Sequence, residues 1–207
     1  MNIGHFSDIH GRVGPIDAAE PVDVWVSSGD FLPDPAWPVD TRQGVERFQT
    51  RWLADHAAEI EARLNGRPLL YVGGNHDFVD IGPTLIRAGV HALSLALHAV
   101  TIGGHVFAGF REVMPLNGWG VSETYEFDAV IKRAFDANPT ILVTHAPPYG
   151  VLDAGYGVPA LTTAFRDRTH RIQAHLFGHI HEHGGEKQVV GAVTHYNAAT
   201  KCVVVHV

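Results

Sequence analysis

The sequence predicts a mixed α/β fold, with strands and helices alternating in its first half and a more antiparallel second half. Short apolar runs that read as strands alternate with segments whose apolar residues recur at helical spacing. The 207 residues are 45% hydrophobic and 18% charged, which is typical of a compact chain that buries its own core. No repeat, low-complexity tract or linker interrupts the sequence. We therefore expect one domain over residues 1–207.

The first half of the chain contains apolar runs that predict strands over residues 2–7, 22–28 and 68–73. Asp40 and Thr41 offer an N-cap for a long helix that Gly66 and Pro68 would close. Helical spacing within it places five apolar residues on one expected buried face: Val45, Phe48, Trp52, Ile60 and Leu64. A short helix is expected over residues 80–89.

The second half begins with a predicted hairpin, residues 97–102 and 105–109, around Gly103 and Gly104. Both glycines can adopt the positive φ that such a turn requires. Helices are expected over 125–138 and 159–169, the second with Pro159 in its first turn. Strands are expected over 140–144, 174–177, 188–196 and 201–207, and the last two are expected to pair with each other in antiparallel fashion.

Composition and charge exclude several classes of protein. The formal net charge of −7 argues against binding long nucleic acid, which needs a basic surface. No apolar stretch reaches the roughly 18 residues of a membrane span, and residues 1–7 do not resemble a secretory signal. Cys202 is the single cysteine, so no intrachain disulfide can form. We expect a cytoplasmic protein that has no membrane partner.

Five short polar clusters carry the chemical information, and each follows an apolar run that predicts a strand. Ligands at the ends of neighbouring strands can converge on one point, whereas polar residues scattered over a surface cannot. The clusters are Asp8-Ile9-His10, Gly29-Asp30, Gly74-Asn75-His76-Asp77, Thr144-His145 and Gly178-His179-Ile180-His181.

Each cluster taken alone also has an ordinary structural explanation. Asp8 is compatible with a turn at a strand end, Asn75 with a turn residue at positive φ, and His145 with a structural histidine. His179 and His181 are two residues apart, a spacing typical of metal ligands. The combined set offers carboxylate, imidazole and amide donors without a thiolate, which favours Mn²⁺, Fe or Zn²⁺.

The five clusters, in this order, resemble the motifs of the calcineurin-like metallophosphoesterase superfamily over residues 3–207. The string from Thr144 to Asp153 and the string from Gly178 to Glu182 resemble a smaller branch of that superfamily. This branch contains the metallophosphoesterase-domain brain proteins, which resemble brain protein 239, and the related class III cyclic nucleotide phosphodiesterases.

The resemblance implies a fold, a pair of metal ions and a role for each residue. The fold would be a two-sheet β-sandwich flanked by helices, and the cofactors two divalent metal ions, Mn²⁺ first with Fe or Zn²⁺ as alternatives. His76 resembles the histidine beside the substrate phosphate, which is not a ligand. Asp8, His10 and His181 would bind one ion, Asn75, His145 and His179 the other, and Asp30 would bridge both.

The function implied is hydrolysis of phosphoesters by a metal-bridging hydroxide, and small phosphodiesters such as cyclic nucleotides are the favoured substrates. A phosphomonoesterase or protein phosphatase, a nuclease and a non-catalytic scaffold of the same fold remain alternatives. The net charge counts against the nuclease. The presence of all seven ligand residues counts against the scaffold.

Residues around the clusters leave further alternatives open. Asp77 could orient His76 or cap the following turn, and we favour the turn. Arg111 could contact phosphate or be solvated. Three aromatic residues in loops could stack on a base or pack within their loops: Trp119, Tyr149 and Tyr156. Four polar residues match no ligand position of the family: Asp34, Glu182, His183 and His195. Residues 31–39, 110–122 and 147–159 are the expected walls of the pocket.

Overall fold

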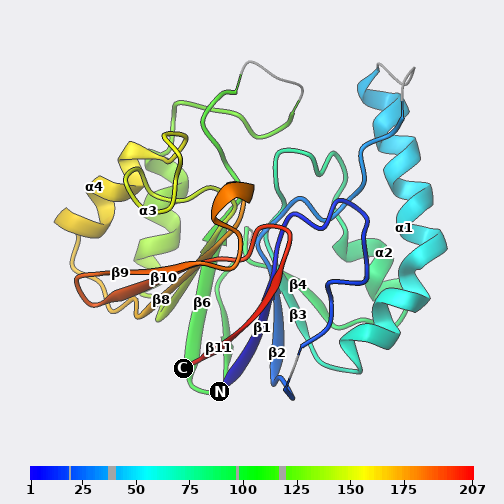
Figure 1. Cartoon of the computed structure of the whole chain (residues 1–207), viewed down its shortest axis with the longest axis horizontal. Coiled ribbons are helices and arrows are strands. Elements are labelled where there is room, and N and C mark those ends of the chain that lie inside the picture. Colours follow the sequence, from blue (N-terminus) through cyan, green and yellow to red (C-terminus); the bar gives the residue numbers. More distant parts are fainter. Residues whose placement is uncertain (19, 37–40, 97, 117–119) are drawn as a thin grey trace.

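Two β-sheets pack face to face in the computed structural model, and helices cover their outer faces (Figure 1). The structure describes all residues except 19, 37–40, 97 and 117–119. In spatial order, the first sheet contains β11 (Cys202–His206), β1 (Asn2–Phe6), β2 (Val24–Ser27), β3 (Leu69–Tyr71) and β4 (Ala92–Ser94). The second contains β5 (Val100–Ile102), β6 (His105–Phe110), β7 (Ile141–Thr144), β8 (Ala174–Phe177), β10 (Val193–Asn197) and β9 (Lys187–Val190).

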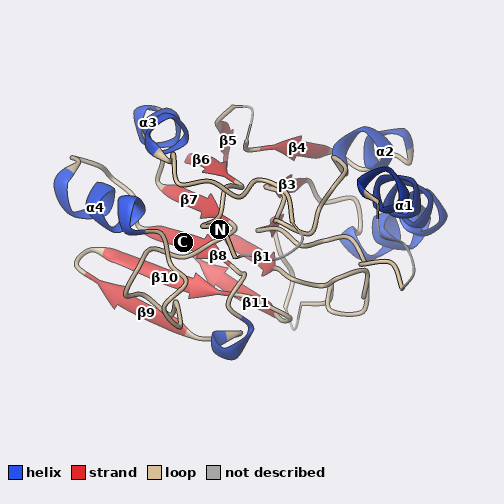
Figure 2. Cartoon of the chain, turned by 90° about the horizontal axis from the view of Figure 1, so that it is seen from above, coloured by secondary structure: helices blue, strands red, loops and turns tan. Residues whose placement is uncertain are grey.

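The helices lie on opposite outer sides of the two sheets (Figure 2). Helices α1 (Arg42–Leu64) and α2 (Gly82–Arg87) pack on the first sheet, where Leu53 and Ile60 join a buried cluster with Trp25. Helices α3 (Asp128–Asp136) and α4 (Pro159–Asp167) pack on the second sheet, where Ile131 and Leu161 join Leu142. A short 3₁₀ helix, η1, spans His181–His183.

The core between the sheets draws side chains from both inner faces. Ile3, Val26 and Leu70 of the first sheet pack in one buried cluster with Phe107 and Val143 of the second. Each large apolar side chain buried in this way contributes roughly 1.5–3 kcal/mol to folding. The predicted mixed α/β class is confirmed, and so is the two-sheet sandwich flanked by helices that the family resemblance implied.

The end of the chain differs from the prediction. The run from 188 to 196 is not one strand, because β9 and β10 form a hairpin that turns at Gly191, whose φ is +59°. Strand β11 does not pair with this hairpin. It pairs antiparallel with β1 in the other sheet, with Gly4 opposite Val204. The sequence analysis also missed β4, which extends that sheet beyond β3.

The buried face of α1 is also shifted from the predicted one. It comprises Val45, Gln49, Leu53, Ala57, Ile60 and Leu64, whereas Phe48 is 36% exposed. The Thr41 side chain caps the helix by accepting a hydrogen bond from the Gly44 amide at 3.1 Å. The other proposed cap, Asp40, lies outside the described residues, as does Leu97 at the start of a predicted strand. That strand, β5, begins at Val100.

Strand direction explains how distant clusters can meet. Strands β1, β2 and β3 run parallel to one another in the first sheet, and β7 and β8 run parallel in the second. Each of these five strands is followed by one of the polar clusters. In each sheet, therefore, the clusters emerge at one edge, where the strands end.

Candidate metal centre

Hydrogen bonds join the loops of the two sheets at this edge. His145, after β7, has its Nδ1 2.8 Å from the carbonyl oxygen of Ser28, after β2. The amide of His179, after β8, donates to Oδ2 of Asp8, after β1, at 2.9 Å. These contacts bring residues more than 100 positions apart into one site.

Asp8, His10 and His181 form the first group of predicted ligands. Each offers a donor atom, and these atoms all lie within 4.8 Å of one another. Nε2 of His181 is 3.2 Å from Oδ1 of Asp8. Asp8 is fully buried while the His181 side chain is 49% exposed, so this group extends from the interior to the mouth of the site.

Asn75, His145 and His179 form the second group. Nε2 of His145 lies 3.1 Å from Oδ1 of Asn75. The rings of His145 and His179 are edge-to-face, with centroids 4.9 Å apart. The structure thus brings together the three residues that the family resemblance assigns to the second ion.

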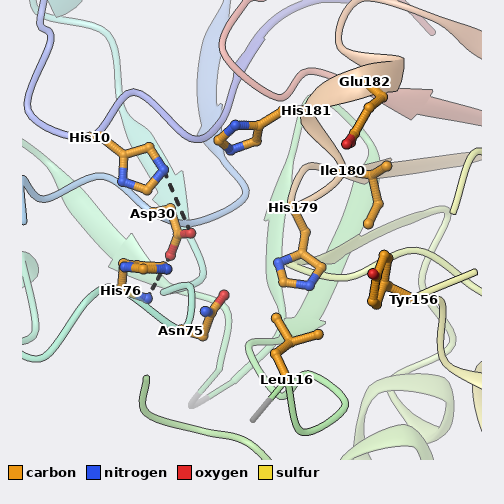
Figure 3. Close-up of a pocket in the computed structure, with 10 residues that line it drawn as sticks. All are labelled: His10, Asp30, Asn75, His76, Leu116, Tyr156, His179, Ile180, His181 and Glu182. Atoms are coloured by element: carbon orange, nitrogen blue, oxygen red, sulfur yellow. Dashed lines mark hydrogen bonds and ion pairs between the residues drawn. The ribbon is translucent and has the colours of Figure 1, made fainter. Parts of the chain in front are cut away.

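Asp30 lies between the two groups (Figure 3). Its Oδ2 is 3.3 Å from Nε2 of His145 and 3.9 Å from Nε2 of His10. Its Oδ1 accepts a hydrogen bond from the backbone amide of His76 at 2.8 Å. One carboxylate oxygen therefore faces a histidine of each group.

The backbone adopts uncommon conformations to present these side chains. Asp8, His10, Asp30 and His179 have φ values of +53°, +43°, +49° and +69°. For residues other than glycine such conformations are uncommon, cost energy, and cluster at functional sites. A Cβ on Gly178 would lie 2.1 Å from Oδ2 of Asp8, and one on Gly74 would lie 2.1 Å from Oδ1 of Asp30. The motif glycines are required because the carboxylates approach the backbone so closely.

The buried charges call for a cation in this site. Burial opposes ionisation of Asp30, but the charge and hydrogen bond of His145 outweigh it and lower the pKa of Asp30. In the same way, burial disfavours the His145 cation, while the charge of Asp30 prevails and raises the pKa of His145 to about 9. Two buried carboxylates, Asp8 and Asp30, repel each other at this point. A cation bound among them would relieve this repulsion.

Two further observations indicate that these donor atoms suit divalent metal ions. Nδ1 of His10 is buried and has no hydrogen-bond partner among the described residues. A second triad of donor atoms within 4.8 Å, from Asp8, Asp30 and His145, overlaps the first. Nitrogen and oxygen donors without sulfur suit Mn²⁺, Fe or Zn²⁺.

Asp34 is a residue of this site that the sequence analysis set aside. Its Oδ1 is 3.0 Å from Nδ1 of His76, and its Oδ2 is 3.8 Å from Nδ1 of His10. The hydrogen bond with Asp34 is the main reason that the pKa of His76 is raised to about 9. The available signal was its position between two prolines, four residues after Asp30, in a loop that follows a ligand strand.

Asp77 and Arg111 support the loop that carries Asn75. Asp77 is buried and accepts hydrogen bonds from the amides of Gly74 and Leu32, both at 2.8 Å. These bonds go to the preceding turn and to the loop after β2, not to the following turn that the prediction favoured. Nη2 of Arg111 donates to the carbonyl oxygens of Gly74 and Asp77 at 2.7 and 2.6 Å. Arg111 therefore stabilises this loop. The two predicted alternatives for Arg111, contact with phosphate and exposure to solvent, did not include this role.

Gln49 fastens α1 to the same loop and was also missed. Its Nε2 donates to the carbonyl oxygen of His76 at 2.7 Å, and its Oε1 accepts from the amide of Phe78 at 2.9 Å. The signal in the sequence was a polar residue four positions after Val45 and four before Leu53, on the buried stripe of a helix.

A cavity of about 430 Å³ opens above the predicted ligands (Figure 3). Leu116 and Tyr156 line it from two of the predicted wall loops, whereas the described part of 31–39 does not line it. Of the other aromatic residues considered for stacking, Tyr149 does not line the cavity and Trp119 lies outside the described residues. His183 pairs with Glu186. The lining residues are His10, Asp30, Asn75, His76, Leu116, Tyr156, His179, Ile180, His181 and Glu182.

The fold and donor set define a metal-binding α/β protein, and comparison with known proteins assigns its family. The model of the calcineurin-like phosphoesterase family matches residues 1–183, so the chain belongs to that family. This membership supports a metal-dependent phosphoester hydrolase. No curated protein matches the chain.

Among solved structures, the chain is similar to the sulfate thiohydrolase SoxB of Thermus thermophilus. The two share 16% sequence identity with a TM-score of 0.46, over 85% of this chain. The match spans only 33% of the SoxB chain. Within the described residues, no helix is both long and apolar enough to cross a membrane.

Proposed function

We propose that the protein is a binuclear metal-dependent phosphodiesterase that acts on small phosphodiesters. Asp8, His10 and His181 would hold one divalent ion, Asn75, His145 and His179 the other, and Asp30 both. When bound, the ion pair supplies positive charge for the phosphoryl oxygens and activates water as the nucleophile.

The position of the Asp30 carboxylate is the observation that carries this proposal. Its Oδ2 lies 3.3 Å from His145 and 3.9 Å from His10, one residue of each ligand group. A carboxylate that served a single ion would have no need to face both groups. The two overlapping donor triads, which share the buried Asp8, support the same interpretation.

We expect His76 to act on the departing oxygen of the substrate. It lines the cavity beside the ligands, and Nδ1 is engaged by Asp34 at 3.0 Å, which leaves Nε2 for the substrate. Asp34 favours the protonated ring, as the raised pKa of His76 reflects. A protonated imidazole in this position can donate a hydrogen bond or a proton to a leaving alkoxide.

The walls of the cavity favour a small diester with an aromatic or nucleoside group. Tyr156 is 57% exposed and lines the cavity together with Leu116 and Ile180. An exposed tyrosine face suits stacking on a planar ring. The net charge of −7 disfavours a long nucleic acid.

Metal analysis of three variants tests the binuclear arrangement. The wild-type protein should bind two Mn²⁺ ions per chain, and Asp30→Ala should lose both, whereas His181→Ala should lose mainly one. Lys201→Ala, which changes an exposed residue outside the site, is the matched control. A wild-type protein that saturates at one ion would contradict the proposal.

A substrate panel tests the preference for diesters. With Mn²⁺ added, bis(4-nitrophenyl) phosphate and the 2′,3′- and 3′,5′-cyclic nucleotides should be hydrolysed with a higher kcat/KM than 4-nitrophenyl phosphate. A preference for the monoester would identify a phosphomonoesterase. Cleavage of duplex DNA that is faster than that of aryl diesters would identify a nuclease.

A further inference from the structure

A second cavity, of about 400 Å³, lies between α4, the β9–β10 hairpin and the loop after β7. It shares no lining residue with the cavity at the metal centre. Its walls are mainly apolar, with Val151, Phe165 and Val193 among them. The mouth includes Val190 of the edge strand β9, which is 46% exposed.

His195 of β10 is a buried polar residue in the wall of this second cavity. Only 2% of its surface is exposed, and its ring packs edge-to-face on Phe165 at 5.1 Å between centroids. Nδ1 of His195 is 3.0 Å from Nδ1 of His175, on the neighbouring strand β8. Its other ring nitrogen, Nε2, has no hydrogen-bond partner among the described residues.

A chain of hydrogen bonds determines which nitrogen of His195 carries the proton. The Thr144 hydroxyl donates its one hydrogen to the carbonyl oxygen of Ala146, at 2.6 Å. It must therefore accept at its 2.8 Å contact with Nε2 of His175, so that nitrogen is the protonated one. Nδ1 of a neutral His175 is then unprotonated and accepts a hydrogen bond from the Nδ1–H of His195.

Both histidines are neutral because they are buried and have no acidic partner within the part of the chain that the structure describes. Burial lowers the pKa of His195 to about 4, and burial with the charge of His195 lowers the pKa of His175 well below its ordinary value. A neutral His195 that donates from Nδ1 has a lone pair at Nε2. His195 therefore offers the cavity a hydrogen-bond acceptor.

The other polar side chains around the cavity already have partners. Arg166 forms two hydrogen bonds with Asp167, at 2.6 and 2.8 Å, so its charge is balanced. Nε2 of His170 is 3.2 Å from the carbonyl oxygen of Phe165, and its Nδ1 accepts from the amide of Ile172. The Thr162 hydroxyl donates to the carbonyl oxygen of Tyr149 at 2.8 Å.

We infer that the second cavity binds a small uncharged aromatic molecule that carries one O–H or N–H donor, which bonds to Nε2 of His195. The volume is within the range of small-molecule pockets, and apolar walls with few polar groups are typical of them. An aromatic ring would pack against Phe165 as His195 itself does. An uncharged ligand is required because the walls offer it no unpaired charge.

Binding of a matched pair of probes by ¹⁹F NMR tests this inference. 4-Fluorophenol has the donor and 4-fluoroanisole lacks it, while their rings are alike. The wild-type metal-loaded protein should bind 4-fluorophenol saturably and about tenfold more tightly, because an unmet buried acceptor disfavours the anisole. His195→Phe should remove this difference. Equal affinity of the wild-type protein for the two probes would overturn the inference.

Two neighbouring substitutions on β9 locate the binding without altering His195. Val190→Trp should fill the mouth and abolish binding of 4-fluorophenol. Val189→Trp is the matched control, because Val189 is 66% exposed and does not line the cavity, and it should leave binding unchanged. Binding that survives Val190→Trp would place the probe elsewhere and contradict the inference. So would sedimentation showing a wild-type dimer that Val190→Trp dissociates, because a second copy would then cover the cavity.

Discussion

At the scale of single residues, the proposed active site depends on a histidine that binds no metal in our assignment. His76 follows Asn75 directly, and its Nδ1 is 3.0 Å from Asp34. Its ring also meets that of His10 edge-to-face, and donor atoms of His76, Asp34 and His10 lie within 4.8 Å of one another. The backbone amide of His76 is held by Asp30 at 2.8 Å. Its position is thus set by one predicted bridging ligand and one acidic neighbour.

Replacing His76 should impair the chemical step and leave the metals in place. We expect His76→Ala to lower kcat by about 10²–10⁴-fold on substrates with a poor alcohol leaving group. The loss should be smaller for nitrophenyl esters, because nitrophenolate departs without protonation. Steady-state kinetics with metal analysis would test this, and a variant that has lost metal would instead make His76 a ligand.

Asp34→Asn should act through His76. The asparagine keeps the size of the side chain but removes the charge that favours a protonated His76. We expect kcat on poor leaving groups to fall by less than in His76→Ala, and Asp34→Asn to have little further effect in the His76→Ala background. Additive losses in the double variant would show that Asp34 acts independently, for example through His10 at 3.8 Å.

The glycine before His179 should be intolerant of any side chain. A Cβ at Gly178 would lie 2.0 Å from Oγ of Ser7 and 2.1 Å from Oδ2 of Asp8. Gly178→Ala should displace the Asp8 carboxylate, weaken metal binding and lower stability by about 1–3 kcal/mol. Metal content and thermal unfolding would measure both effects. Gly14→Ala is the control, since a Cβ there has no neighbour within 4 Å, and an equal loss there would contradict the steric explanation.

At the scale of elements, α1 does more than cover the first sheet. Through Gln49 it binds the backbone of the loop that presents Asn75 and His76. The packing of a helix thereby contributes to the geometry of the predicted second metal group, although no residue of α1 lines the cavity.

Gln49→Leu should loosen this loop. The change keeps an apolar contact but leaves the amide of Phe78 and the carbonyl of His76 without the partner they have in Gln49. Each of these partly buried hydrogen bonds contributes about 0.5–1.5 kcal/mol, so denaturant unfolding should show a loss of stability, with lower kcat. Thr50→Ala, at the next and exposed position of the helix, should be nearly neutral. An unchanged kcat in Gln49→Leu would show that α1 does not contribute to the geometry of the site.

At the scale of the whole molecule, buried histidines in both sheets link stability to pH. Burial lowers the pKa of His5 to about 3 and of His195 to about 4, and it lowers that of His175 well below 6.5. In the unfolded chain these groups would titrate near their ordinary pKa of about 6.5. Below that pH the unfolded state binds more protons, so acid favours unfolding.

The stability of the metal-free protein should therefore fall as the pH drops from about 6.5 towards 4.5. Each histidine that stays neutral in the folded state contributes a slope of up to about 1.4 kcal/mol per pH unit. Urea unfolding across this range would measure it. His195→Phe should reduce the slope by the contribution of one histidine, up to about 1.4 kcal/mol per pH unit. The exposed His206→Gln should leave the slope unchanged. A slope of zero for the wild-type protein would show that the buried histidines are protonated in the fold.

Local sequence patterns were sufficient for most elements and for the predicted ligands. The strands that precede the clusters were recognised because a short apolar run bounded by polar residues is a local signal. The seven predicted ligands came from motif resemblance, and the structure brings all seven into one site. The structure adds why glycines stand beside them, since the close approach of Asp8 and Asp30 leaves no room for a side chain.

What depended on contacts between distant segments was decided only by the tertiary structure. The pairing of β11 with β1 joins residues about 200 positions apart, and no local pattern distinguishes it from pairing with the nearer β10. Asp34, Gln49 and Arg111 act through partners that other loops supply, so their own neighbours in sequence are uninformative. The proton on His195 likewise follows from Thr144 and His175, on neighbouring strands. A side chain's role depends on what the fold places beside it, and the sequence by itself determined only which chemistry was available.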